Sequence, residues 1–531
     1  MNNGKYCFSW ANIFGAMIAE IACVWQQMKG LKFAGSNYRK LVLPILSFYL
    51  LFMLTGCSVS NVSYDANHKF SPAELQEDSK VLWQTLQEVH PSLYWYNSKD
   101  SVDAAFNNLP AMLTDSLTEA QFRNVLAQKV ALVRCGHTSI RSSKAASKSR
   151  EGIKKPFFPL QVKTWAGDSM IVLANAFRQD SVLTRGTSIH RINDLPVRTI
   201  VDSICRFISA DGLHNNFRYQ LISNNFPGWY RAIFGIAENY KLDITATNGD
   251  NKTVYIKNFD PIIEDSIAGK KPGGNEVMHR IPERHYRYEN DRKLTIDTAR
   301  HLAIMDLNTF SHAKLPSFFR KSFRKLKKEN IENLVIELRE NGGGNIINST
   351  RLSRYLSDHP FKVADTVAAK SFKYPYPSQV KNGFIYKLQS WFVTSRRDDG
   401  RLHYRMYEKK YFKPYTKNHF DGKVFLLTGG FTFSASTLFI NPLVHQENIT
   451  IIGEETGGGA YGNTAVNVPD LTLPNTGIRV RLPLYHLVVN KNLPHNGRGI
   501  IPDILVPPSS WHLARRIDPK MMKVYELIGS K

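Results

Sequence analysis

The chain has 531 residues, 43% of them hydrophobic, and a formal net charge of +24. Its length allows about two to four globular domains with real cores, which excludes a wholly disordered chain. The positive charge suits anionic surfaces such as lipid headgroups or lipopolysaccharide, or it is only a solvated basic surface. Nucleic acid is not expected as a partner, because the sequence contains no zinc-finger or RNP-type pattern.

Residues 1–56 are predicted to be a leader. Leu41–Leu54 is an apolar run of fourteen residues preceded by lysines and arginines. It is short for a membrane span, which needs about 20 residues, and fits the apolar region of a secretory signal. We expect the true start at Met28, with residues 1–27 an upstream extension. The alternative is an apolar helix from Phe8 to Trp25.

The leader ends in the sequence LTGC, which resembles the bacterial lipobox. The resemblance implies that Cys57 becomes the lipidated first residue of the mature protein. Ser58 follows it, which in such lipoproteins suggests the outer membrane, so the chain is expected in the cell envelope, facing the periplasm. Residues 57–69 then form a lipidated tether.

Residues 70–150 are predicted to form a small helical domain. A capping box, SPAE at 71–74, starts the first helix, and further helices are expected near 101–113 and 118–134. The domain ends in the sequence CGHT, which contains Cys135 and His137. Cys135 and Cys205 are the only cysteines after Cys57, and the two make neither a disulfide framework nor a zinc site.

Residues 157–262 change to short alternating strands with one helix near 197–207. The phrase SIHRINDLPVRTIVDSI resembles a PDZ domain, although the glycine-rich carboxylate-binding loop of that family is not evident. Residues 263–288, rich in glycine, proline and charge, are predicted to be a linker. Residues 511–531 are predicted to be a C-terminal helix.

Residues 289–510 are predicted to form an α/β core, with an insertion at 370–418. The insertion carries twelve lysines and arginines against three acids, interleaved with aromatic residues. Such interleaving can bind single-stranded nucleic acid, but a solvent-exposed hairpin flap is preferred. Residues 424–459 read as strand, turn, helix, strand and glycine loop, with the helix running to about His445.

Ser434 stands at the start of that helix. Backbone N–H groups point outward there, and the helix dipole favours negative charge, so the position suits a nucleophile whose reaction builds an oxyanion. The alternative is that Ser434 only caps the helix.

Five motifs occur in the order VRCGHTSI, LVIELRENGGGN, TFSAST, IIGEETGGG and GIIPDILV. Together they resemble the S41 peptidase family, which includes tail-specific and tricorn-type proteases. The resemblance covers about residues 70–510. It implies a multidomain α/β protein with a crotonase-like core, a helical domain and a PDZ-like, β-rich domain.

The resemblance gives Ser434 the role of nucleophile. It also implies an oxyanion hole made by the N–H of Ala435 and one N–H from the glycine turn, Gly342 or Gly343. The chemistry agrees, because glycine allows close backbone approach and N–H donors stabilise a developing alkoxide.

The general base is expected to be His137. Tail-specific proteases use a lysine in the glycine-rich turn, but no lysine lies between Lys423 and Lys491. Tricorn-type members take a histidine from the helical domain, in a motif that His137 matches. Neutral imidazole, with an ordinary pKa of about 6.5, suits this work. The weaker rivals are His445, His486 and His495.

The third catalytic member stays open among Asp503, Glu454 and Glu455, because the place of the tricorn-type glutamate holds no carboxylate. Two other positions depart from the family pattern: Glu337 stands for aspartate, and Thr437 follows SAS in place of glutamate.

The sequence therefore predicts a serine-type peptidase that cleaves cell-envelope proteins or peptides through an acyl-enzyme, with no metal or cofactor. The alternative is a catalytically inactive, peptide-binding scaffold lipoprotein. Acyl-CoA chemistry on a crotonase-like core does not suit an exported protein. The sequence does not indicate the oligomeric state.

Overall fold

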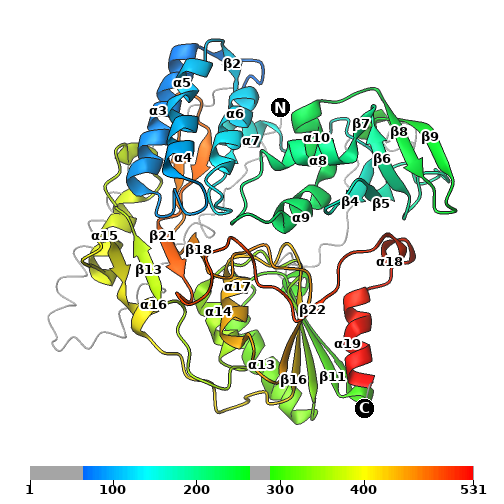
Figure 1. Ribbon diagram of the computed structural model, residues 1–531, viewed down its shortest axis with the longest axis vertical. Coiled ribbons are helices and arrows are strands. Elements are labelled where there is room, and N and C mark those ends of the chain that lie inside the picture. Colours follow the sequence, from blue (N-terminus) through cyan, green and yellow to red (C-terminus); the bar gives the residue numbers. More distant parts are fainter. Residues whose placement is uncertain (1–63, 264–287, 530–531) are drawn as a thin grey trace, which may run out of the picture. The chain divides into compact units, whose positions relative to one another are not determined.

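The computed structural model describes residues 64–263 and 288–529, which form a mixed α/β, multidomain fold with several sheets (Figure 1). The predicted leader, Cys57 and almost all of the predicted linker lie outside the described residues. Within the two described ranges, no helix is both long and apolar enough to cross a lipid bilayer.

The core is built on a six-stranded sheet. Its strands are parallel except for the first, so the carboxyl ends of five strands meet at one edge. In spatial order the strands are β10 (Arg292–Asp297), β11 (Leu302–Leu307), β12 (Asn333–Glu337), β16 (Lys423–Thr428), β17 (Ile449–Gly453) and β22 (Ile504–Leu505).

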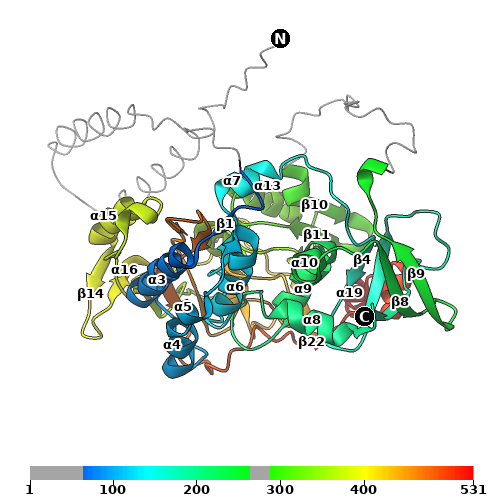
Figure 2. The same cartoon turned by 90° about the horizontal axis from the view of Figure 1, so that it is seen from above.

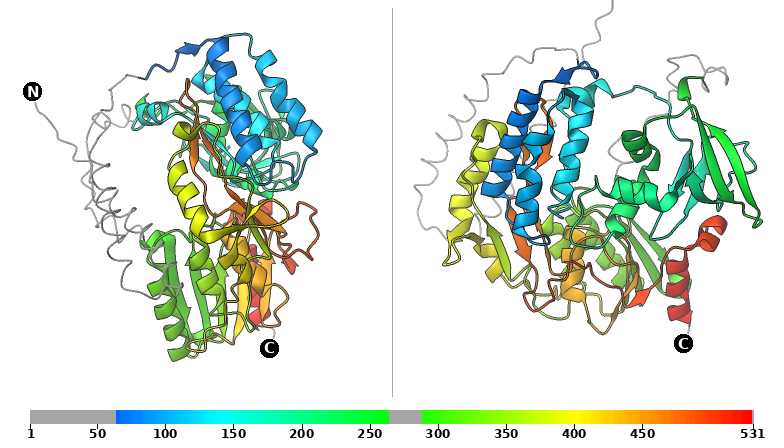
Figure 3. Two further views of the ribbon diagram at one scale, coloured as in Figure 1. Left: turned by 90° about the vertical axis from the view of Figure 1, so that its left-hand side faces the viewer. Right: turned by 45° about the horizontal axis from the view of Figure 1, so that its top comes forward.

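Helices cover both faces of this sheet. Side chains alternate between the two faces along each strand, so the strands present apolar side chains on both faces. Leu334 and Ile336 pack on one face with α13, α14 and α17, whereas Val335 packs on the other with Val524 of α19 (Figures 1 and 3). The helices of this part are α13 (Leu315–Lys328), α14 (Ile346–Ser353), α17 (Ala435–Ile440), α18 (Ser510–Arg515) and α19 (Pro519–Gly529). The predicted C-terminal helix is therefore the two helices α18 and α19.

The N-terminal part, residues 64–150, is mainly helical and is called the helical part below. Ser71 forms the predicted capping box with Glu74. The elements are β1 (Lys69–Phe70), α3 (Pro72–Val89), α4 (Lys99–Asn107), α5 (Leu109–Met112), β2 (Leu117–Thr118), α6 (Glu119–Ala131), β3 (Ile140–Arg141) and α7 (Lys144–Ser149).

The helical part shares its hydrophobic core with later segments of the chain. Leu82 and Leu86 of α3 belong to the same cluster as Tyr404 and Leu487, and β3 pairs with β20. We call this cluster the shared core. The later elements are β13 (Thr366–Ala369), α15 (Gly383–Val393), β14 (Thr394–Arg396), β15 (Leu402–Tyr404), α16 (Arg405–Lys409), β18 (Gly462–Ala465), β19 (Asp470–Thr472), β20 (Arg479–Arg481) and β21 (Tyr485–Val488).

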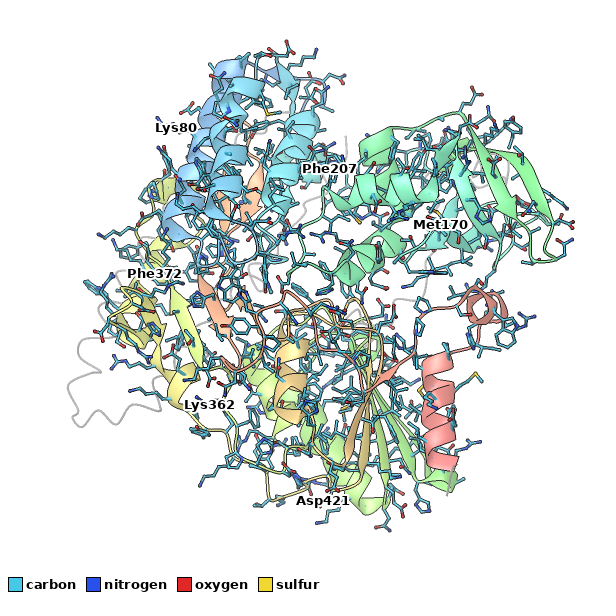
Figure 4. All side chains as sticks on the ribbon, viewed as in Figure 1. Lys80, Met170, Phe207, Lys362, Phe372 and Asp421 are labelled. Carbon is cyan, nitrogen blue, oxygen red and sulfur yellow. The ribbon has the colours of Figure 1, made fainter. Side chains whose placement is uncertain are left out.

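Residues 157–259, the middle domain, have a hydrophobic cluster of their own. Met170 projects from an antiparallel sheet into this cluster (Figure 4), and the view from above sets the sheet apart from α3 and α4 (Figure 2). The elements are β4 (Leu160–Lys163), β5 (Met170–Asn175), β6 (Ser188–Ile192), β7 (Leu195–Pro196), α8 (Val197–Cys205), α9 (Asn216–Asn224), α10 (Phe226–Phe234), β8 (Asn239–Thr245) and β9 (Asn251–Lys257). Its likeness to a PDZ domain, and that of the core to crotonase, stay predictions.

Two expectations need correction. The insertion at 370–418 contains the hairpin β14–β15, but it is not merely a solvent-exposed flap, since Phe372 and Tyr404 are buried in the shared core. The helix after Ser434 ends at Ile440 rather than near His445. Pro442 has no N–H to continue the α-helical hydrogen bonds, and the chain goes on as a short 3-10 helix over Asn441–Leu443.

Candidate active site

Three loops meet at the carboxyl edge of the core sheet, one after each of β12, β16 and β17. Thr432 Oγ1 donates to the carbonyl of Leu338 (2.9 Å), and the Phe433 N–H donates to the carbonyl of Asn341 (3.2 Å). The Gly458 N–H donates to the carbonyl of Thr432 (3.2 Å). The loop that carries Ser434 is therefore tied to both neighbours, at the edge where open α/β sheets bind their ligands.

Ser434 has an unusual backbone, with φ 56° and ψ −118°. A non-glycine residue in such a region costs about 1–3 kcal/mol and persists only where its surroundings impose it. Its side chain makes no capping hydrogen bond with α17 and is partly exposed. The interpretation of Ser434 as a helix cap is therefore wrong for its side chain.

His137 lies beside this serine, with its Nε2 atom 2.9 Å from Ser434 Oγ. The histidine belongs to the turn after α6, and its ring packs on Phe433 at 4.8 Å between centroids. The turn comes this close only because residue 136 is glycine: a Cβ there would lie 2.6 Å from the Phe433 ring. The structure thus brings together the two residues that the sequence assigned to one site.

His137 is 8% exposed, and burial lowers the pKa of its imidazole to about 3, with a smaller effect from the charge of Arg481. The imidazole is therefore neutral at neutral pH and able to accept a proton. For Nε2 to accept from the Ser434 hydroxyl, the ring proton must sit on Nδ1. That atom is buried and has no hydrogen-bond partner among the described residues.

The predicted oxyanion donors differ in availability. The Gly343 N–H already donates to Asn341 Oδ1 (2.9 Å), so it is not free for an oxyanion. Gly343 instead provides room, since its φ is +99° and a Cβ there would lie 2.7 Å from the Cβ of Ser434. Within the described residues, the N–H groups of Ala435 and Gly342 have no acceptor, which leaves them as the candidate donors.

The carboxylates predicted as third member all have other partners. Asp503 accepts from the Ile451 N–H (2.7 Å) and Glu454 pairs with Lys520 (2.7 Å). Glu455 accepts from Arg498 (2.7 Å) and from the Gly499 N–H (2.8 Å). The assignment of Asp503 as orienter is therefore not supported, because its carboxylate accepts from the middle of β17.

The rival histidines also have other surroundings. His486 Nδ1 lies 2.7 Å from the Arg401 guanidinium, His495 packs on Trp95, and His445 is exposed beyond α17. The two residues that depart from the family pattern have structural roles. Glu337 pairs with Arg339, and Thr437 Oγ1 donates to the carbonyl of Ser434 (2.7 Å).

Asp211 is a buried residue near the site that the sequence did not reveal. One ligand atom each of Cys135, His137 and Asp211 lies within 4.8 Å of the others, the one group in the described chain that could hold a metal ion. Burial raises the pKa of the Cys135 thiol to about 11, which opposes the thiolate that a metal needs. Asp211 stands before glycine, a pair that predicts only a turn.

Comparison with solved structures shows the fold. The chain resembles mature CPAF with a TM-score of 0.60 at 13% identity, over 87% of this chain and 98% of that one. It resembles mature CPAF complexed with lactacystin with a TM-score of 0.59 at 14% identity, over 87% and 99%. Comparison with curated protein sequences gave no match.

The family follows from the sequence of the core domain. Residues 301–506 match the sequence model of Peptidase family S41, and this range contains the sheet strands β11 to β22, the glycine turns and Ser434. Through this domain the chain is therefore similar in sequence to peptidase family S41.

Proposed function

We propose that the chain is a serine peptidase in which Ser434 is the nucleophile and His137 the general base. The observation that carries the proposal is the 2.9 Å contact between Ser434 Oγ and His137 Nε2, made by a serine in a strained backbone at the edge of the core sheet. The match of residues 301–506 to peptidase family S41 supports hydrolysis of peptide bonds.

In the first step, the Ser434 hydroxyl gives its proton to His137 Nε2 while Oγ attacks the substrate carbonyl carbon. The carbonyl oxygen takes the electron pair and becomes an oxyanion, for which the N–H of Ala435 and that of Gly342 are the proposed donors. The intermediate collapses when the C–N bond breaks, and the leaving amine takes the proton from His137. An acyl ester on Ser434 remains.

In the second step, His137 takes a proton from water, and the hydroxide attacks the ester carbonyl. The second tetrahedral intermediate releases the carboxylic acid, and Ser434 regains its proton from the imidazolium. The step consumes one water and restores both side chains, so the reaction needs no cofactor.

The substrates proposed are proteins or peptides of the cell envelope. Support for this location comes only from the apolar leader and the lipobox-like sequence before Cys57. The middle domain is a candidate for binding substrate chains, on the PDZ-like sequence pattern. Acidic substrate segments suit the net positive charge of the chain.

The test compares Ser434→Ala and His137→Asn with Ser436→Ala as a matched control. Ser436 is buried two residues away and donates to the carbonyl of Asn341, so its loss changes a hydrogen bond but not the nucleophile. We expect the first two variants to lose about 10³-fold or more in casein cleavage, and Ser434→Ala to lose fluorophosphonate labelling. Labelling of the Ser434→Ala protein would refute the nucleophile. A folded wild-type protein that binds peptides without labelling or cleavage would favour the inactive scaffold.

A further inference from the structure

Asp211 lies in the loop between α8 and α9 of the middle domain and is 3% exposed. Its Oδ1 atom accepts from the N–H of Gly136 (2.7 Å), the residue before His137. Its carboxylate also interacts with the backbone N–H of Gly459, in the glycine loop beside Ser434. The carboxylate is thus attached to the turn that carries the base and to the loop that borders the nucleophile.

His137 Nδ1 and Asp211 Oδ2 are among the buried polar atoms that have no hydrogen-bond partner in the described parts of the chain. A ring nitrogen of His137 and a carboxylate oxygen of Asp211 lie within 4.8 Å. Asp211, Cys135 and Asn463 also line a cavity of about 10 Å³, which has room for about one water. A rotation of the side chains would be required to bring the two atoms into hydrogen-bond contact.

The proposed chemistry needs such a carboxylate. When Ser434 gives up its proton, His137 becomes a cation in a buried place, and a buried cation without a counter-ion is costly. A carboxylate at Nδ1 keeps the ring proton there, leaves Nε2 free to accept, and stabilises the imidazolium. The acids predicted from the sequence interact with other groups, whereas Asp211 Oδ2 has no hydrogen-bond partner among the described residues.

We propose that Asp211 is the positioning residue of His137, so that the nucleophile, the base and the orienting carboxylate come from the core, the helical part and the middle domain. The inference rests on the proposed function. The carboxylate stays ionised while the proton moves between Ser434 and His137, and no bond to Asp211 forms or breaks.

The pH dependence follows from the groups that face Asp211, which are Tyr96, Arg134, Cys135 and His137. Burial raises the pKa of Asp211 to about 7 and that of the Cys135 thiol to about 11, and it also raises the pKa of Tyr96. Of Asp211, Cys135 and Tyr96, only Asp211 therefore has a pKa near neutral pH. Activity should rise with pH as Asp211 ionises.

The test measures kcat, KM and fluorophosphonate labelling rates from pH 5 to 9 for Asp211→Asn and Asp211→Glu. We expect the asparagine variant to lose about 10²- to 10⁴-fold in kcat with KM within about three-fold, and to lose the rise of activity near pH 7. The glutamate variant should recover part of kcat and keep a pH-dependent limb. Asp78→Asn is the control, because Asp78 is equally buried but accepts from Asn475 and Thr476, so it should lower stability without changing the pH profile.

The outcomes separate the two proposals. If the wild type neither cleaves nor is labelled at Ser434, the proposed function fails. If the wild type is active and Asp211→Asn keeps kcat within about three-fold and an unchanged pH profile, the role of Asp211 is refuted while the proposed function stands. A folded Asp211→Asn protein that is labelled slowly at Ser434 supports both.

A second inference comes from α15 in the insertion, which is apolar on both faces. Val393 and Tyr386 pack against the shared core. The opposite face presents large apolar side chains to solvent, with exposed fractions of 75% for Phe384, 81% for Trp391 and 71% for Phe392. Ile385 and Leu388 extend the same stripe, and together these five residues are called the apolar face.

Exposed basic residues accompany this face. Lys381, Lys387 and Arg396 are exposed on or next to α15, within an insertion of twelve basic and three acidic residues. One of those acids, Glu408, is buried and paired with Arg397. The helix lies at the edge of the described structure, clear of the core sheet (Figures 1 and 2).

We infer that the apolar face of α15 inserts into the headgroup region of an anionic lipid surface. Tryptophan and phenylalanine beside lysine and arginine are the side chains of interfacial helices, which gain from apolar burial and from attraction to anionic lipids. A second copy of the chain fits less well, because two copies of the same basic insertion would repel each other.

The test is hydroxyl-radical footprinting of the full chain, read by mass spectrometry at Trp391 and Phe392. The chain is studied in detergent, with phosphatidylcholine vesicles, and with vesicles containing phosphatidylglycerol. We expect oxidation of both residues to fall at least about three-fold with the anionic vesicles only. Trp511 and Tyr255, exposed aromatic residues on other elements, serve as internal controls and should not change.

Equal oxidation of Trp391 under all conditions would refute the inference, whether or not the chain is attached to the vesicles elsewhere. Equal protection by both kinds of vesicle would refute the requirement for anionic lipid. Protection that rises with protein concentration in the absence of vesicles would show that a second copy covers the face.

Discussion

The helical part and the middle domain each bring a side chain to Ser434, but they are attached to the core in different ways. The helical part has no separate hydrophobic core, because its apolar residues share one cluster with residues near 363–407 and 465–487. The middle domain has a closed cluster of its own and meets the catalytic loops through a small set of residues around Ala210 and Phe217. His137 therefore belongs to the part that shares its core with later segments, whereas Asp211 belongs to a domain with a hydrophobic cluster of its own, which we expect to unfold separately.

The largest effect on stability is expected from substitutions that distinguish the shared core from the core of the middle domain. Leu86→Ala in the shared core and Ile244→Ala in the middle domain remove similar buried side chains, each at a cost of about 2–5 kcal/mol. Leu86→Ala should lower the unfolding temperature of the catalytic part, whereas Ile244→Ala should produce a separate, earlier transition. Scanning calorimetry with fluorophosphonate labelling at each temperature measures both. A single common transition in both variants would contradict the comparison.

The shared core should also lose stability in acid. Burial, aided by Arg401, lowers the pKa of His486 to about 4. The unfolded chain takes up the proton near its ordinary pKa of about 6.5, and the folded chain only near 4, so folding loses up to about 1.4 kcal/mol per pH unit as pH falls between these values.

Denaturant unfolding at pH 7 and pH 5 measures this loss. His486→Gln should reduce the difference between the two pH values by about 2 kcal/mol. A variant whose stability depends on pH as steeply as the wild type would show that other groups cause the loss.

The contact between the middle domain and the catalytic loops is tested by Phe217→Ala. The Phe217 ring stacks on Phe433 at 4.6 Å, and Phe433 in turn supports His137. We expect kcat to fall about ten-fold, equal to about 1.4 kcal/mol, while the fold is kept. Phe259→Ala is the control, since Phe259 packs on Phe157 and Phe177 within the middle domain. An equal loss of kcat in the control would argue against a local contact.

The smallest effect is expected at Arg498, whose side chain is half exposed and pairs with Glu455. Arg498→Gln should cost about 1 kcal/mol or less, because exposed ion pairs contribute little. Glu455 keeps its hydrogen bond from the Gly499 N–H. kcat should stay within about two-fold in a steady-state assay. A large loss would give Glu455 a catalytic part that its contacts do not suggest.

The sequence predicted the parts of the core that depend on local pattern. The buried strands around 424–427 and 449–453 are apolar runs that end in glycine, and the structure has strands there. Ser434 and His137 could be paired only through the order of five motifs, since no local pattern relates residues so far apart. The mixed α/β fold was predicted, whereas the PDZ-like and crotonase-like assignments need evidence of another kind.

There are physical reasons why the other features of the fold and the site could not be predicted from the sequence. Periodicity shows which face of a helix is buried but not what covers it, so the joint packing of α3 with residues 465–487 was missed. Asp211 was missed because its raised pKa is caused by burial, and the sequence does not show that this residue is buried. The engagement of the Gly343 N–H by Asn341 depends on a side-chain rotation that no motif records.

Gly136 has a consequence for how the site could be controlled experimentally. The absent side chain at this position is what allows the Phe433 ring between His137 and Phe217. One added methyl group would act as a molecular spacer: it would keep the serine, the imidazole and the carboxylate chemically intact while it increased their separation. A series of side chains of increasing size at this one position would therefore show how the reaction rate depends on the distance between nucleophile and base.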